Sequence, residues 1–112
     1  MNDSLTSCFA VIFHNKVSNQ ASRYTDMANR MFELAQKQPG FLEIESVRDS
    51  NQIGITVSYW KSLEDIHHWK QHSEHLLAQQ YGKSEGYDWY HLTVCEVMYD
   101  RRFNREDHGS AS

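Results

Sequence analysis

The sequence predicts an α+β domain with the element order β-α-β-β-α-β, the ferredoxin-like arrangement, in which a four-stranded antiparallel sheet carries two helices on one face. Three observations lead to this fold class. Four extended segments are interrupted by two segments of helical periodicity, each lying between two extended ones. The first and last extended segments are apolar on both faces, as expected for strands covered on both sides. A length of 112 residues fits one such domain.

The first half of the chain reads as strand, helix and turn. Residues 8–14 form a continuous apolar run rich in Phe, Val and Ile, which predicts a strand. After a polar stretch, a helix is expected up to about Gln38, because apolar side chains recur on one stripe: Tyr24, Met27, Ala28, Met31, Leu34 and Ala35. Pro39 disfavours helical geometry at the residue before it, and Gly40 permits the chain to reverse.

The second half repeats the pattern with a hairpin at its start. Residues 41–47 alternate between apolar and acidic side chains and predict a second strand, and a polar turn leads into a third strand at 53–60. Ser62, with Asp65 three residues later, predicts the N-terminal cap of a helix that runs to about residue 81. The last strand is expected at 87–99. We expect residues 1–7 to be an N-terminal tail, residues 8–100 the folded domain and residues 101–112 a disordered polar tail.

The strand faces predict a second copy of the chain. Right-handed crossovers place both helices on the same face of the sheet, so the other face has no cover within one chain. Both faces of the end strands are nevertheless apolar: Phe9, Val11 and Phe13 against Ala10 and Ile12, and Tyr90, Leu92, Val94 and Met98 against Trp89, Val97 and Tyr99. Because a large open apolar patch is unfavourable in a monomer, we expect a homodimer through the open sheet face.

Composition excludes several classes of partner. The net charge of −4 disfavours nucleic-acid binding, which needs clustered Lys and Arg. No apolar run approaches the roughly 20 residues of a membrane-spanning helix. The N-terminal residues lack the basic start and apolar stretch of a signal peptide, so a cytoplasmic protein without membrane contact is expected. Cys8 and Cys95 lie in apolar strand segments without a CxxC spacing, and both are expected to be buried thiols.

Three sequence phrases resemble the antibiotic biosynthesis monooxygenase family, the dimeric α+β barrel group. They are QPGFL at 38–42, GITVSYW at 54–60 and WKQHSEH at 69–75. The resemblance spans roughly residues 8–100 and implies a ferredoxin-like protomer whose sheets pair into a dimeric α+β barrel. It further implies a cofactor-independent monooxygenase acting on a small aromatic or quinol-like substrate. Because other members bind or degrade haem, the alternative is a non-catalytic dimeric module that binds a hydrophobic ligand or haem.

The resemblance also indicates where a site would lie. It implies that Trp69 lines a cavity between helix and sheet, although a large core residue is the alternative. Where cofactor-free members carry an Asn before and a Tyr after this Trp, the present sequence has Asp65 and His75. Haem-degrading members have an iron-ligating His ten residues after the Trp, and here that residue is Gln79, which puts haem degradation in doubt. They also use an Asn on the first strand, which Asn15 matches.

Histidines and aromatic residues supply the remaining candidates. Glu64, His68, His72 and His75 recur at helical spacing, which fits either a weak metal site at His68 and His72 or a solvated polar face. His75 and His91 are the candidates for a general base, because an imidazole titrates near neutrality. Trp60, Tyr59 and Tyr90 are candidate aromatic lining, with core or dimer interface as the alternative. No GxSxG elbow or glycine-rich phosphate loop occurs, so no built-in nucleophile, flavin or nucleotide site is expected.

Overall fold

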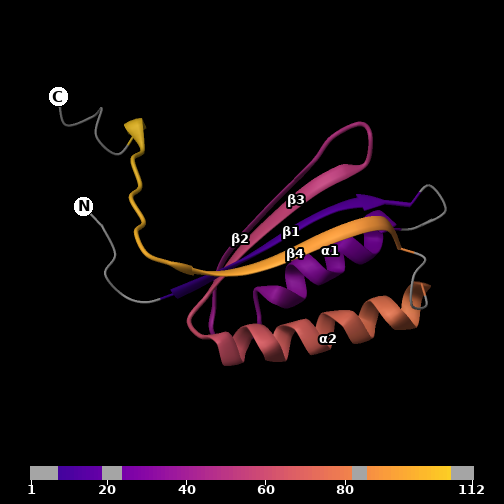
Figure 1. Cartoon of the computed structure of the whole chain (residues 1–112), viewed down its shortest axis with the longest axis horizontal. Coiled ribbons are helices and arrows are strands. Elements are labelled where there is room, and N and C mark those ends of the chain that lie inside the picture. The colour runs from indigo at the N-terminus through magenta and orange to yellow at the C-terminus, as the bar shows by residue number, and fades with distance from the viewer. Residues whose placement is uncertain (1–7, 19–23, 82–85, 107–112) are drawn as a thin grey trace.

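The computed structural model describes residues 8–18, 24–81 and 86–106. Its elements are β1 (Cys8–Val17), α1 (Tyr24–Ala35), β2 (Phe41–Arg48), β3 (Ile53–Trp60), α2 (Leu63–Tyr81) and β4 (Tyr87–Val97). The strands form one antiparallel sheet in the order β2-β3-β1-β4. Both helices lie on one side of the sheet (Figure 1). The predicted ferredoxin-like fold class is therefore confirmed.

Four element boundaries differ from the prediction. β2 ends at Arg48, one residue later than expected. β1 continues to Val17, three residues further than expected, because its polar end pairs with β3 and β4. α1 ends at Ala35 rather than at about Gln38. After it the chain forms turns with i to i+3 hydrogen bonds, in which Lys37 N donates to Leu34 O and Gln38 N donates to Ala35 O. β4 ends at Val97, two residues earlier than expected, where the ladder with β1 also ends.

The strand register divides the sheet into a helix-facing side and an open face. Trp60 of β3 stacks on Trp69 of α2 and pairs with Phe9 of β1, so the odd-numbered residues of β1 face the helices. Phe13, Asn15 and Val17 therefore lie on the helix-facing side. The even-numbered residues of β1 and the residues that pair with them across the sheet lie on the open face. These residues include Ile12, His14, Glu43, Glu45, Val47, Ile55, Val57, Tyr59, Trp89 and His91.

Most of the buried apolar residues lie between the helices and the two ends of the sheet, whereas Ala10, which is also buried, lies on the open face of β1. At one end Val17 of β1 packs with Met27 of α1, next to the partly buried Met31 and Tyr87. At the other end the buried apolar residues are Trp60, Ala35 and Ile66. The core of a single chain is thus formed on the helix-facing side.

The open face remains solvent-accessible within a single chain. Val47 is 65% exposed, and Ile55 and Trp89 are also exposed.

Cys95 is exposed and Cys8 half-buried, so the prediction of two buried thiols was wrong. The reason is that β4 is an edge strand and, among the residues that the structure describes, no element covers its open side.

The segment after β4 leaves the sheet on the open side (Figure 1). Arg102 forms ion pairs with Glu43 at 2.6 Å and with Asp100 at 3.2 Å. The hydrogen bond to Glu43 and the charge of that carboxylate raise the pKa of Arg102.

Residues 1–7 of the expected N-terminal tail and residues 107–112 of the expected C-terminal tail lie outside the described residues. None of the helices among the described residues is long and apolar enough to cross a membrane.

Gly40 illustrates how a turn residue positions the second helix. Its φ of 79° is a conformation that favours glycine, and a Cβ built there would clash with the carboxylate of Asp65 in the first turn of α2. We therefore expect Gly40→Ala to lower the free energy of unfolding by about 1–3 kcal/mol, measured by urea denaturation. Ser50→Ala, in the exposed turn between β2 and β3, is the control and should change stability by less than about 0.5 kcal/mol. Equal effects of the two changes would contradict the prediction.

Candidate functional site

One group of aromatic side chains on the helix-facing side is built around Trp60. This side chain is 0% exposed, and its Nε1 donates a hydrogen bond to Ser58 Oγ at 2.9 Å. Trp69 of α2 stacks on it with ring centroids 6.2 Å apart and an interplanar angle of 22°, while Phe41 meets it edge-on at 5.6 Å. Because Trp69 itself is only half-buried, it presents aromatic surface beyond the stack. The three rings form an aromatic wall, which we call the tryptophan wall (Phe41, Trp60 and Trp69).

Asp65 helps to hold α2 against the sheet at the same end. Ser62 Oγ accepts a hydrogen bond from Asp65 N at 3.0 Å and donates one to Asp65 Oδ2 at 2.8 Å. This is the predicted N-terminal cap, and it confirms the helix start. It also occupies the carboxylate, so Asp65 acts first as a capping residue and lies next to Gly40 rather than over the indole rings.

Asn15 lies at the opposite end of the helix-facing side. It pairs with Gly54, six residues along β3 from Trp60, so about 20 Å of strand separates Asn15 from the tryptophan wall. The side chain is 1% exposed, and its Oδ1 accepts a hydrogen bond from Arg48 Nη2 at 2.9 Å. A ligand in contact with both Trp60 and Asn15 would therefore have to extend along most of the sheet.

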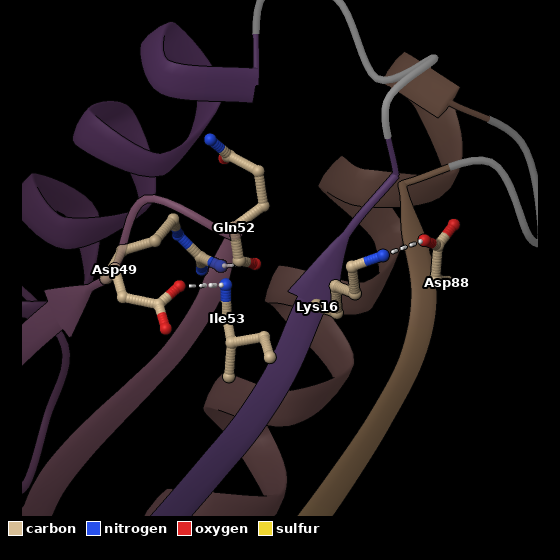
Figure 2. A network of polar contacts seen from close by, with 6 residues as sticks. Lys16, Asp49, Gln52, Ile53 and Asp88 are labelled. Atoms are coloured by element: carbon tan, nitrogen blue, oxygen red, sulfur yellow. Dashed lines mark hydrogen bonds and ion pairs between the residues drawn. The ribbon is translucent and has the colours of Figure 1, made fainter.

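The turn between β2 and β3 holds this end of the sheet in place. Asp49 Oδ1 accepts hydrogen bonds from Asn51 N at 2.9 Å and from Ile53 N at 3.0 Å, the second of which Figure 2 shows. Gln52 follows with a φ of 69°, and its carbonyl oxygen accepts from Val17 N at 2.9 Å. On the other side of β1, Lys16 forms an ion pair with Asp88 at 3.1 Å (Figure 2).

Tyr90 is the neighbour of Asn15 on β4 and joins a second aromatic group. Its ring lies 5.7 Å from that of Phe13 and 6.0 Å from that of Tyr87. Tyr90 is 62% exposed because β4 is an edge strand. The predicted aromatic lining is thus divided between two ends of one sheet side.

The histidines do not converge on one point. His68, His72 and His75 project from the exposed side of α2, and only His72 has a ring contact with Trp69, at 5.8 Å. His91 lies on the open face opposite His14, so the sheet separates it from Trp69. Within residues 8–18, 24–81 and 86–106, no three His, Cys, Asp or Glu side chains come together as metal ligands.

Tyr59 also lies on the open face, because neighbouring residues of a strand point to opposite sides. It lines an open groove of about 610 Å³ together with residues of β2, β3 and the segment after β4. Arg102 lies over its ring, 5.9 Å from the centroid. Tyr59 and Trp60 therefore lie on opposite faces of the sheet and cannot both line one site in a single chain.

Two functional candidates were not predicted from the sequence. Arg48 ends β2 and reaches Asn15, which is 33 positions away in the chain. Gly54 lies between them on β3. The glycine inside an otherwise apolar strand was a signal of close approach by another group, but only the strand register shows that the group is Arg48.

Comparisons with known proteins agree with this fold. The model of the family described as Monooxygenase af470-like matches residues 8–103. The uncharacterized protein YqjZ of Bacillus subtilis (strain 168) is 45% identical over 95 residues, which cover 85% of this chain and 83% of YqjZ. The fold and the family model together define a domain of a monooxygenase family. The chain belongs to the monooxygenase af470-like family.

Solved structures show the same architecture at low sequence identity. A mutant form of SnoaB, a cofactor-independent oxygenase from Streptomyces nogalater, superposes with a TM-score of 0.62 at 10% identity, covering 78% of this chain and 89% of SnoaB. A conserved protein from Methanosarcina mazei Go1 superposes with a TM-score of 0.66 at 14% identity, covering 80% and 91% of the two chains. A Nitrosomonas europaea protein whose name proposes an antibiotic biosynthesis monooxygenase has a TM-score of 0.61 at 8% identity, covering 88% and 97%. These likenesses concern the fold.

Proposed function

We propose that this protein is a cofactor-independent monooxygenase that oxidises an aromatic or quinol-like substrate on the helix-facing side of its sheet. The observation that carries the proposal is the tryptophan wall, in which the indole of Trp69 lies nearly parallel to that of the fully buried Trp60. A flat, partly exposed aromatic surface held by a rigid neighbour suits a flat apolar ligand. Membership of a monooxygenase family supports the reaction class.

The reaction needs little from the protein besides binding and proton transfer. An acidic phenol with an activated methylene group loses a proton, and the resulting anion transfers electrons to O2. One oxygen atom enters the substrate as a carbonyl, and the other leaves as water with the two hydrogens of the methylene group, so no external reductant is required. The protein supplies orientation, exclusion of water and a weak base. SnoaB, which shares the fold, is named as cofactor-independent, and we extend that property to this chain.

The structure favours particular residues for these roles. Trp69, held by the buried Trp60 behind it, binds the ring, and His72 is the general base because its ring contacts Trp69. His75, one turn further along α2, is the alternative base. Asn15 and Tyr90 would contact the far end of a ligand that extends along the sheet.

The open face supports the proposal that the active form is a homodimer. Exposed apolar side chains on β2, β3 and β4 require a cover that residues 8–18, 24–81 and 86–106 of one chain do not provide. In such a dimer, His91 and Tyr59 lie between the two sheets rather than beside Trp69. We place this dimer in the cytoplasm, as the sequence predicts.

Oxygen uptake tests the proposed activity. With a panel of anthrones and dihydroxyarenes, we expect the wild-type protein to consume O2, and we expect Trp69→Ala to lower kcat/KM at least about tenfold because the ring-binding surface is lost. Trp69→Phe keeps a flat ring and should stay within about threefold. Phe32→Leu, on the exposed side of α1, is the control and should match the wild type. No uptake above background over the whole panel would refute the proposal.

A second candidate function is a non-catalytic dimeric module that binds a hydrophobic ligand or haem. It is favoured by one observation: His75 and His91, the two predicted bases, lie on different surfaces and cannot act on one ligand together. Titration with hemin separates the haem version from the oxygenase. A shifted Soret band without oxygen uptake would support this second candidate.

A further inference from the structure

Arg48 reaches across one whole strand on the helix-facing side. It ends β2, yet its Nη2 donates to the Oδ1 of Asn15 on β1 at 2.9 Å, passing over Gly54 of β3. We propose that Arg48 is a positioning residue, which fixes the amide of Asn15 so that its NH2 group is a hydrogen-bond donor for an oxygen atom of the ligand. The ligand part of this inference rests on the proposed function, whereas the positioning does not.

The chemistry of the guanidinium decides the orientation of the amide. A guanidinium group only donates hydrogen bonds, so the atom of Asn15 that faces Arg48 must be the oxygen. The NH2 group then points away from Arg48 and donates a long hydrogen bond, 3.4 Å, to the carbonyl oxygen of Phe13. Because Asn15 is 1% exposed, reorientation of the amide would bury an NH2 group against a cation. Arg48 therefore selects one of the two amide orientations.

Gly54 makes the contact possible. A Cβ built on Gly54 would lie 2.6 Å from Arg48 Cζ and 2.8 Å from its Nη2. Any other residue at this position would thus displace the guanidinium. Because Gly54 has no side chain, the guanidinium of Arg48 on β2 can pass over β3 and reach Asn15 on β1.

The turn between β2 and β3 anchors Arg48 independently of Asn15. Arg48 Nη1 donates to the carbonyl oxygen of Gln52 at 2.7 Å, and the same oxygen accepts from Val17 N. Asp49 holds the turn through its two backbone hydrogen bonds. The guanidinium is therefore fixed from both sides, so the amide of Asn15 is preorganised before a ligand arrives, which is the condition for an effective donor.

The orientation of the amide can be measured without any substrate. In a 15N-labelled sample, the side-chain NH2 signals of Asn15 are identified by their loss in Asn15→Asp. We expect these protons to exchange with solvent about tenfold faster in Arg48→Met and in Gly54→Ala than in the wild type, with Arg48→Lys in between. Gly54→Ala is the sharper variant because it changes neither partner. Arg102→Met, which removes an ion pair on the open face, is the control and should leave the signals unchanged.

Kinetics then tests whether Arg48 acts through Asn15. With an oxidised substrate long enough to extend along the sheet, Asn15→Ala and Arg48→Met should each raise KM about 10- to 100-fold with kcat within about twofold, because Asn15 lies about 20 Å of strand from the tryptophan wall. The double variant should be no worse than Asn15→Ala alone. Additive losses would overturn the inference. So would an exchange rate of the Asn15 NH2 protons that stays the same in Arg48→Met and in Gly54→Ala. If the Met and Ala variants do not fold, Arg48→Lys decides the NMR comparison. Coupled NMR signals without oxidation of any substrate would support the positioning and refute the proposed function.

Discussion

Trp60→Ala is expected to lower the free energy of unfolding by about 3–5 kcal/mol, a large part of the stability of a small domain. The side chain is 0% exposed and contacts Phe41 and Trp69, so its removal leaves a cavity between the sheet and α2. Urea denaturation followed by circular dichroism measures the change. A reduced midpoint with an unchanged slope would show that the native state, rather than the compactness of the unfolded chain, is affected.

Two variants serve as controls for this prediction. Trp60→Phe keeps a ring but removes the donor to Ser58 Oγ, which is buried, so we expect a smaller loss of about 1–3 kcal/mol. Leu63→Ala removes a side chain that is 55% exposed in the first turn of α2, away from the open face. The prediction fails if Leu63→Ala costs as much as Trp60→Ala in the same titration.

Ile12→Glu is expected to convert the proposed homodimer into a monomer. Ile12 lies on the central strand β1, between Val57 and Thr93, and on the open face. In a two-fold symmetric interface each chain would bury the new carboxylate without a partner, so the penalty of several kcal/mol applies twice. The association constant should therefore fall at least about a thousandfold. Sedimentation equilibrium over a range of protein concentrations measures this change.

Leu63→Glu is the matched control for the dimer prediction. Leu63 is 55% exposed in the first turn of α2, on the other side of the sheet, where an acidic residue suits the helix N-terminus. This variant should associate like the wild type. A wild-type protein that sediments at the mass of one chain would contradict the homodimer, and equal weakening by both variants would contradict its location on the open face.

Local patterns predicted the elements because each depends on nearby residues. β3 has the predicted bounds, and the cap at Ser62 and Asp65 is present as expected. The strand ends were less predictable, since β1 continues through His14, Asn15 and Lys16 as long as β3 and β4 provide hydrogen bonds. No local pattern contains that information.

The candidate site was predictable in its residue types and not in its arrangement. Trp60 and Trp69 do lie together, because the helix that follows β3 folds back over its end. Tyr59 and His91, by contrast, lie on the open face, which follows from the strand register. Since a shift of one residue reverses every side chain of a strand, a candidate chosen by residue type alone has an equal chance of either side.

The sequence by itself determined the fold class, the order of the elements and an open face that requires a cover. These features follow from apolar periodicity, turn residues and caps, all of which act over a few positions. The tertiary structure alone decided that Arg48 meets Asn15 over Gly54 and that the aromatic residues divide between two ends of the sheet. Contacts between residues far apart in the chain depend on the register of three strands at once, and no single segment carries that information.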